Sequence, residues 1–339
     1  MTYIILFVVL FAILNAYIYV AKRFNISDKP NSRSSHSKIT IRGGGIIFPV
    51  GAFIWFFWSG FQYPLFFLGL AIISLISFLD DILQLSNRIR LLIQLGAVVM
   101  MFSELGLQLL PWWSWVVLLI LAAGILNAYN FMDGINGITS GYSLAVLSGL
   151  WLVNNFQEKF IANEFIYFTI ISVAVFSFFN FRRRAICFAG DVGSISLAFI
   201  VIFMLALLIQ QTGNPIYILF LSVYGADSIL TILYRLRNKE NIFEAHRKHI
   251  YQLMANELKI SHLVIATIYS VLQLIICFIV YLTILKDLKG RANLIFGLGF
   301  IVVLTLMYAV IRYSISLKLR NNKKENFSLL NWPYGLLSK

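Results

Sequence analysis

The chain has 339 residues, of which 60% are apolar and only 12% are charged, and its mean hydropathy is +0.84. A soluble domain is about half apolar and about a quarter charged, so this composition excludes an ordinary soluble enzyme and predicts a polytopic membrane protein. The net charge of +13 suits anionic lipid headgroups and phosphorylated ligands. No nucleic-acid partner is expected, because the sequence offers no soluble basic domain to hold one.

Apolar runs of about 20 residues, the length that crosses a hydrocarbon core about 30 Å thick, recur along the chain. They predict an all-α fold, a polytopic transmembrane helix bundle of about eleven spans. The sixth run is the weakest, because it opens with polar and glycine residues. The predicted spans are 3–21, 44–60, 64–82, 91–107, 112–130, 138–154, 161–180, 194–211, 214–234, 262–285 and 293–314. The first is expected not to be a cleaved signal peptide, because it lacks a basic n-region and ends in Ala-Lys-Arg.

The basic residues predict the orientation of the bundle. With the N-terminus outside, the inner loops and the C-terminal tail hold 22 of the 27 Lys and Arg residues. The outer loops hold four, and Arg312 lies in the last span. We therefore expect an N-out, C-in topology, with nearly all residues capable of chemistry on the cytosolic side.

The loop 28–45, DKPNSRSSHSKITIRGGG, is the first polar cluster. Arg42 followed by three glycines at the mouth of a helix brings a guanidinium together with backbone N–H groups, an arrangement that receives phosphate. Ser34, Ser35 and His36 add hydrogen-bond donors. The alternative is a solvated basic loop, which charge runs commonly are.

Asp80 and Asp81 form the second cluster, at the inner end of the third span. Adjacent carboxylates beside a bilayer are costly unless water or a cation neutralises them, and acids in membrane segments are functional by default. Neighbours in a helix point about 100° apart, so the two can take separate roles. The alternative is a helix-end pair that faces water.

The third cluster is NAYNFMDGINGITSG, residues 127–141, directly after an apolar run. Steps of three residues keep Asn127, Asn130 and Asp133 in contact along one helix face, and Asn136 follows at the same step. The glycines let the chain bend and let a ligand approach closely. Interhelical amide contacts are the alternative, but they explain neither the carboxylate nor the glycines.

The fourth cluster, CFAGDVGSIS at 187–196, places Asp191 between two glycines at the start of the eighth span. Capping of that helix is a strong alternative explanation for an Asp at this position. A carboxylate here would, however, face Asp80, Asp81 and Asp133 across the same surface. A hard divalent cation would relieve their repulsion, and Mg²⁺ prefers such oxygen ligands together with substrate phosphates.

The fifth cluster is EAHRKHIYQL, residues 244–253. His246 and His249 could share a helix face, and with Arg247 they suit a diphosphate better than a zinc ion that lacks a third ligand. A solvated basic loop remains the alternative. Asp227 lies on a polar face of the ninth span and is expected to face the bundle interior, where a neighbouring cation could hold it.

These five clusters, in this order and on one side of the membrane, resemble the polyprenyl-phosphate N-acetylhexosamine-1-phosphate transferase family (glycosyltransferase family 4). That family includes the phospho-N-acetylmuramoyl-pentapeptide translocase. The resemblance covers nearly the whole chain and is strongest to the O-antigen-initiating branch. It rests on PNSRSSH with RGGG, the Asp pair, NAYNFMDG, AGDVGS and HRKHIYQ.

The resemblance implies that residues 1–315 form a transmembrane catalytic domain and residues 316–339 a basic cytosolic tail. A UDP-N-acetylamino sugar would give its sugar-1-phosphate to undecaprenyl phosphate in a bacterial inner (plasma) membrane, releasing UMP as a first step of cell-surface polysaccharide synthesis. Membrane lipids are further expected partners, and a homodimer is left open. The cofactor implied is Mg²⁺, with Mn²⁺ as an alternative.

Roles for single residues follow from the same resemblance. Catalytic roles are expected for Asp80, Asp81, Asp133 and His249, and metal binding for Asp191. Asp80 and Asp81 act as a base or position substrate or metal. Substrate binding is expected for Arg42, Asn127, Asn130, Asn136, Asn180, His246 and Arg247. Arg42 and its glycines would hold the lipid phosphate.

The chain departs from the family pattern at two places. Asn136 stands where many relatives have Asp, and Tyr251 and Gln252 follow His249 where relatives often repeat histidine. Two other classes of protein remain alternatives. A secondary transporter would place its acids near the bilayer midplane, and a membrane-embedded, metal-dependent phosphohydrolase would use water in place of the lipid phosphate.

Overall fold

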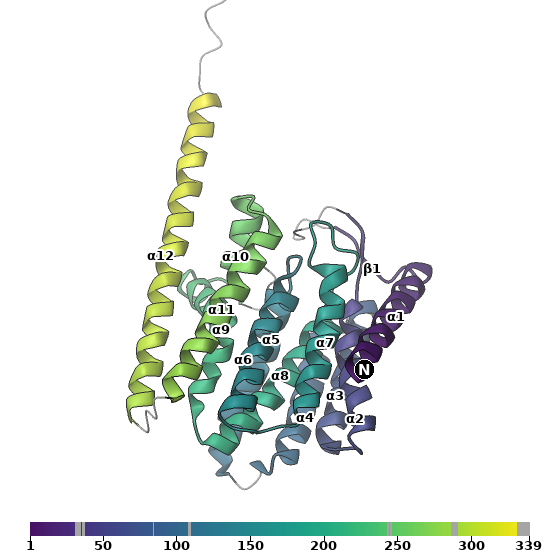
Figure 1. Cartoon of the computed structure of the whole chain (residues 1–339). Helices are drawn as coiled ribbons and strands as arrows, with labels where there is room; N and C mark the ends of the chain where they lie inside the picture. Colours follow the sequence, from purple (N-terminus) through teal and green to yellow (C-terminus); the bar gives the residue numbers. More distant parts are fainter. Residues whose placement is uncertain are drawn as a thin grey trace, which may run out of the picture.

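The protein is an all-α bundle in this computed structural model, which describes residues 1–30, 35, 38–83, 85–107, 110–242, 244, 246–285 and 291–330. Its long helices run roughly side by side, with α1 at one edge and α12 at the other (Figure 1). The helices are α1 Thr2–Arg23, α2 Ile47–Trp58, α3 Pro64–Leu83, α4 Asn87–Glu104, α5 Trp112–Met132, α6 Ile138–Phe156, α7 Asn163–Asn180, α8 Gly190–Thr212, α9 Ser222–Arg237, α10 Ile250–Gln252, α11 His262–Leu285 and α12 Arg291–Leu330.

Short elements complete the bundle. Two-residue strands β1 (Ser27–Asp28) and β2 (Thr40–Ile41) pair antiparallel in the connection between α1 and α2. Short non-α helical segments precede α2 and α9 and follow α10, at Gly44–Ile46, Pro215–Leu221 and Leu253–Glu257.

Every predicted span falls on a helix, and the all-α fold is confirmed. Within the described residues, eight helices are long and apolar enough to cross a membrane. They are α1, α3, α5, α7, α8, the Pro215–Arg237 segment that ends in α9, α11 and the Ile295–Leu319 part of α12. The other three predicted spans correspond to α2, which is short, and to α4 and α6, so the number of spans and their orientation stay predictions.

Local chemistry sets several helix ends. Pro64 begins α3, where its fixed φ suits the first helical position and its missing N–H costs nothing. The Ser86 side chain accepts a hydrogen bond from the Ile89 N–H at the start of α4. Gly213, in the left-handed region at φ +64°, ends α8.

The core is built around α8, whose membrane segment is 83% buried, whereas that of α12 is 11% buried. A helix that is apolar on all sides belongs in the interior. The Phe66 ring of α3 stacks on Phe203 and Phe199 of α8, with centroids 3.9 and 5.4 Å apart. This packing holds α3 against α8, and the last turn of α3 lies at the same end of the bundle as the first turn of α8.

Candidate active site

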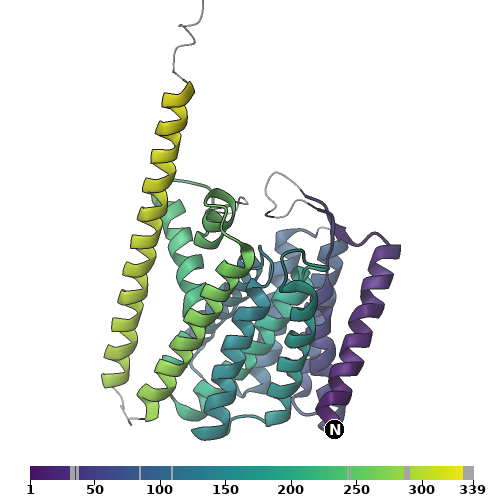
Figure 2. The ribbon, with the colours of Figure 1, turned by 45° about the horizontal axis from the view of Figure 1, so that its top comes forward.

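The predicted acidic residues gather at one end of the bundle. Asp80 and Asp81 lie in the last turn of α3, Asp133 directly follows α5, and Asp191 lies in the first turn of α8. Figure 2 shows the N-terminus at the opposite end. Because the acids lie at helix ends, they do not have the midplane position expected in a transporter.

Two arginines link three of these carboxylates. Arg42 Nε lies 2.6 Å from Asp81 Oδ1, and an Arg42 terminal nitrogen lies 2.9 Å from Asp191 Oδ1. Arg90, at the start of α4, lies 2.8 Å from Asp80 Oδ2 and 3.2 Å from Asp191 Oδ2. Each oxygen of Asp191 therefore contacts a different guanidinium. The pairs join the Arg42 loop, α3, α4 and α8.

Asp81 also supports the start of α8. Its oxygens accept the backbone N–H groups of Asp191 and Val192 at 2.8 and 3.1 Å, and its side chain is fully buried. Free N–H groups at a helix start need acceptors, and here α3 supplies them. Asp81 thus caps the start of α8, the role considered above for Asp191. The Asp191 side chain pairs with Arg42 and Arg90 instead.

The glycine run after Arg42 packs directly on the Asp191 loop. The Gly44 and Gly45 N–H groups donate to the carbonyls of Phe188 and Ala189 at 2.9 and 3.0 Å. A Cβ at Gly45 would lie 2.3 Å from the Gly193 Cα. The prediction that these N–H groups are free to receive phosphate is therefore wrong for Gly44 and Gly45, whose glycines serve a close backbone approach.

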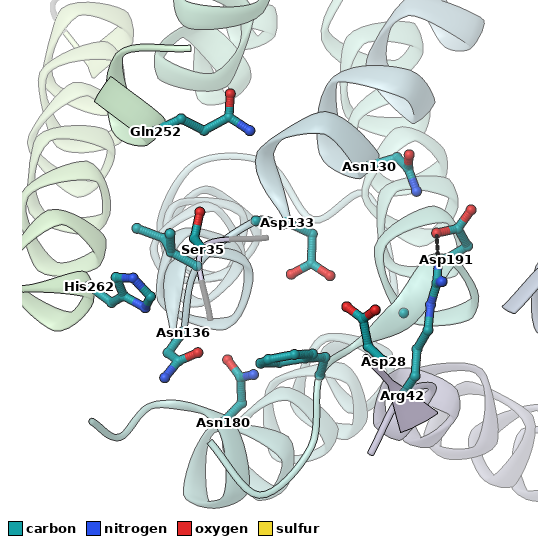
Figure 3. A pocket seen from close by; sticks show the side chains of 14 residues that line it. Asp28, Ser35, Arg42, Asn130, Asp133, Asn136, Asn180, Asp191, Gln252 and His262 are labelled. Carbon is teal, nitrogen blue, oxygen red and sulfur yellow. Dashed lines mark hydrogen bonds and ion pairs between the residues drawn. The ribbon is translucent and has the colours of Figure 1, made fainter. Parts of the chain in front are cut away.

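A cavity of about 310 Å³ opens beside this network. In Figure 3, Asp28 and Asp133 face the same space as the Arg42–Asp191 pair, with Asn136 and Asn180 on one side and Gln252 on another. Such a volume lies within the range of small-molecule sites. The lining is completed by Ser35, Asn130, Gly134, Ile135, Phe188, Gly190 and His262.

Asp133 has a distinctive environment in this cavity. Burial raises the pKa of its carboxyl group to about 6, and the charge of Asp191 adds to the rise. The hydrogen bond from Thr139 Oγ1, at 2.7 Å, and the charge of Arg42 act in the opposite direction. Asp133 consequently changes charge close to neutral pH.

The amides divide into ligand-facing and structural groups. Asn136 Nδ2 donates to the Arg182 and Arg183 carbonyls at 3.0 and 3.3 Å, which a carboxylate could not do, and its buried Oδ1 has no partner among the described atoms. Asn180 joins two loops, accepting from the Gly137 N–H and donating to the Cys187 carbonyl.

Two further predicted amides lie on α5. Asn130 lines the cavity and donates to Ser194 Oγ at 3.3 Å. Asn127 donates to the Ala123 carbonyl of its own helix and does not line the cavity. Of the four predicted amides, Asn130 and Asn136 are therefore the two placed best for a ligand.

The histidine segment, residues 246–252, lies across the cavity from the glycine run. His249 is 2% exposed and does not line the cavity, and its Nδ1 lies 3.4 Å from Asp227 Oδ1. Burial lowers the pKa of His246 to about 4, so it is neutral at neutral pH. Its Nδ1 accepts from the Lys248 N–H at 3.3 Å.

Arg247 lines a second, basic cavity of about 760 Å³. This cavity shares Ser35, Asn136, Phe188 and His262 with the first. Its other basic side chains are Lys38, Arg183, Arg184 and Lys259. Two predicted hydrogen-bond donors, Ser34 and His36, lie outside the described residues.

The acidic side chains of the site are candidate ligands for a divalent metal. Within the described part of the chain, no group of three or more His, Cys, Asp or Glu side chains is arranged to hold an ion. The donor type nevertheless fits Mg²⁺, because the site offers carboxylate oxygens. Five carboxylates at the site (Asp28, Asp80, Asp81, Asp133 and Asp191) face the two bridging arginines, so a divalent cation would balance excess negative charge.

Sequence reasoning missed Arg90 and Asp28. The signal for Arg90 is its position: clustered carboxylates require cations, and Arg90 lies in the first turn of α4, the helix that follows Asp80 and Asp81. Asp28 was quoted within its loop but given no role, and nothing in its local sequence marks it. Its place depends on the β1–β2 pairing.

The chain is similar in sequence to one family model and to several known proteins. The sequence model described as glycosyl transferase family 4 matches residues 63–209. The chain is 30% identical over 266 residues to the "Undecaprenyl-phosphate alpha-N-acetylglucosaminyl 1-phosphate transferase" of Yersinia pestis, covering 70% of this chain and 73% of the relative.

Two further relatives agree with this. The protein of Escherichia coli (strain K12) with that same name is 28% identical over 258 residues, covering 69% of this chain and 70% of the relative. The "Probable undecaprenyl-phosphate N-acetylglucosaminyl 1-phosphate transferase" of Bacillus subtilis (strain 168) is 28% identical over 316 residues, covering 81% and 87%.

Proposed function

Since the chain belongs to glycosyl transferase family 4, we propose that it transfers an N-acetylamino-sugar 1-phosphate from a UDP-sugar to undecaprenyl phosphate and releases UMP. The observation that carries the proposal is the joining of Asp80, Asp81 and Asp191 by Arg42 and Arg90 beside a cavity that contains Asp133. Phosphoryl transfer depends mainly on positioning and on balancing charge.

In the proposed reaction, an oxygen of the lipid phosphate attacks the phosphorus that carries the sugar. A new P–O bond joins the two phosphates, the bond from that phosphorus to the oxygen bridging to UMP breaks, and UMP leaves with the electron pair. The sugar C–O bond stays intact, so the anomeric configuration is retained. The lipid phosphate is already ionised near neutral pH, so no strong base is required.

The side chains of the cavity have distinct proposed tasks. Asp81 and Arg42 fix the start of α8 and thereby aim Asp191. Asn136 Oδ1, a buried acceptor without a partner among the described atoms, receives an N–H of the nucleotide or of the acetamido group. Asp133, ionised above a pH of about 6, lines the space in which the diphosphate lies.

A Mg²⁺ or Mn²⁺ ion is proposed as cofactor, held by Asp191 with neighbouring carboxylates. When bound, it would supply positive charge to the diphosphate and to the leaving UMP. Asp191 would then share its oxygens between the ion and the arginines that contact it.

The donor and the location are also proposals. The names of the relatives above support UDP-N-acetylglucosamine as the sugar donor. We further propose an N-out, C-in topology in a bacterial inner membrane with the site facing the cytosol, supported by the 22 of 27 basic residues that this orientation places inside.

The test is incubation of membranes that contain the protein with undecaprenyl phosphate and a panel of UDP-sugars, with the lipid product identified by mass. The proposal expects a lipid diphosphate sugar in the presence of UDP-N-acetylglucosamine, formed at least about 100-fold more slowly by Asp191→Asn membranes. Release of phosphate without the lipid acceptor would instead favour a phosphohydrolase.

A further inference from the structure

Asp227 on α9 is a buried carboxylate that does not line the candidate site. It is 2% exposed and accepts four hydrogen bonds. Two come from side chains, Thr231 Oγ1 at 3.2 Å and Tyr269 Oη at 2.7 Å. A carboxylate surrounded by donors inside a membrane bundle is well satisfied, and the identity of the other donors shows what it holds.

The remaining contacts of Asp227 all belong to the histidine segment. The backbone N–H groups of Ile250 and Tyr251 donate to it at 3.0 and 3.4 Å, and His249 Nδ1 lies 3.4 Å away. Two adjacent N–H groups at the start of a helical turn are the groups that lack partners within the turn. Asp227 therefore fixes where this turn begins.

The same segment forms part of the wall of the site. Tyr251 Oη donates to the Phe131 carbonyl at 2.7 Å, next to the end of α5. The Tyr251 side chain packs on Gly134, where an added Cβ would lie 2.2 Å from the Tyr251 hydroxyl oxygen and 3.0 Å from the nearest ring carbon. Gln252 lines the cavity beside Asp133. A displacement of the segment would therefore move both Gln252 and the support beneath the Asp133 loop.

A second anchor reaches the segment from α12. Arg312 donates to the Lys248 carbonyl at 3.1 Å and to Tyr308 Oη at 2.5 Å. Its guanidinium lies 3.8 Å from the centre of the Tyr234 ring of α9, a cation–π contact. Tyr308 Oη in turn lies 2.8 Å from Thr231 Oγ1, a partner of Asp227. The two anchors thus belong to one network.

We propose that Asp227 is a positioning residue for the transfer reaction, which holds Tyr251 and Gln252 at the wall of the cavity, and that Arg312 is its second anchor. This proposal rests on the function proposed above. Asp227 acts through the backbone of the histidine segment and does not touch the substrate. Its loss is expected to displace the wall and leave the acid–arginine network in place.

The activity test compares Asp227→Asn with Tyr269→Phe. Both remove a hydrogen-bonding partner from the same buried cluster, but only Asp227→Asn weakens the hold on the segment. We expect Asp227→Asn to lower kcat/KM by about 100-fold per folded molecule, the scale of a small misplacement at an active site, and Asp227→Glu to restore part of it. Tyr269→Phe should stay within about threefold.

A second measurement reports the position of the cavity wall independently of the transfer reaction. The native cysteines Cys187 and Cys277 are buried, so a cysteine introduced by Gln252→Cys can be followed by alkylation with a charged maleimide. We expect the alkylation rate, measured without nucleotide, to rise several-fold in the Asp227→Asn background and in the Arg312→Leu background. The Tyr269→Phe background should leave it unchanged.

The two readouts separate the two proposals. Unchanged alkylation in both the Asp227→Asn and Arg312→Leu backgrounds would overturn the positioning role, and so would equal losses of activity in Asp227→Asn and Tyr269→Phe. If Asp227→Asn yields no folded protein, Arg312→Leu carries both tests. Faster alkylation in a protein that forms no lipid product from any UDP-sugar would keep the positioning role in the wall and refute the transferase function.

Discussion

Asp191 and Asp227 are both buried aspartates in membrane helices, but different kinds of partner surround their carboxylates. Asp191 lies beside the cavity and is bridged by two arginines. Asp227 lies behind the wall of the cavity, where it accepts four hydrogen bonds from neutral donors and His249 Nδ1 lies 3.4 Å away. Acids in membrane segments are a default sign of function, but here the partner decides the kind of function. The aspartate that we propose to react is paired with two arginines, and the one that we propose as a support accepts its hydrogen bonds from neutral donors.

Replacement of Asp191 by Asn is expected to have the largest effect. The substitution keeps the shape but removes the charge that Arg42 and Arg90 share. Activity should fall about 100- to 1,000-fold, as for other groups that stabilise charge in a transition state. Initial rates of UMP release measure it. Retention of more than a tenth of the activity would remove Asp191 from the reacting site.

Gly45→Ala should have the next largest effect, because it destabilises the folded structure around the site. The new Cβ would lie 2.3 Å from the Gly193 Cα and 2.9 Å from the Ala189 carbonyl oxygen. These are backbone atoms, so no side-chain rotation can relieve the clash. Overpacking of this kind costs about 1–3 kcal/mol, so the melting temperature in detergent should drop.

The matched control is Gly96→Ala on α4, where a Cβ would meet no atom within 4 Å. Ala favours a helix over Gly by about 1 kcal/mol, so the melting temperature of this variant should hold or rise. Equal melting temperatures for the two variants would contradict the close approach of the two glycine loops.

Arg90→Gln tests whether the arginine bridge matters beyond Arg42. Removing the cation shared by Asp80 and Asp191 takes the arginine from Asp80 and leaves Arg42 as the one arginine that contacts Asp191 among the described residues. Activity should fall by roughly tenfold or more, whereas Arg88→Gln, which changes an exposed arginine two residues earlier, should stay within about twofold. Similar rates for the two variants, measured side by side, would show that Arg42 alone suffices.

The smallest predicted effect is a shift in the pH profile. Because burial raises the pKa of Asp133 to about 6, activity that needs its carboxylate should be lost as the pH falls through about 6. Thr139→Val removes a hydrogen bond that lowers this pKa, so the acid limb should move to higher pH. Ser140→Ala, whose hydroxyl donates to the Gly137 carbonyl instead, should leave the limb in place.

Features that depend on local sequence were predictable. Apolar runs located every long helix, because burial in lipid requires a continuous apolar stretch. The family was recognised correctly from motifs around Asp80, Asp133, Asp191 and His249. Composition does not fix the number of membrane spans, since α2 is an apolar helix too short to count among the eight candidate spans of the described residues.

Features that depend on which helices are neighbours were not predictable. The partners of Asp227 come from α9, α11 and the histidine segment. The pairing of Arg90 with Asp191 joins positions about a hundred residues apart. The sequence also predicts a phosphate cradle at the glycines after Arg42, but the Gly44 and Gly45 N–H groups donate to carbonyls of the Asp191 loop. Periodicity and composition carry no information on such contacts.

The central claim, transfer of a sugar phosphate and not of a sugar, is tested most directly with UDP-N-acetylglucosamine labelled with ³²P at the phosphate next to the sugar. After reaction with undecaprenyl phosphate, the account predicts that the label is in the lipid and that the nucleotide released is unlabelled UMP. Label recovered in UDP, with an unlabelled lipid product, would contradict it.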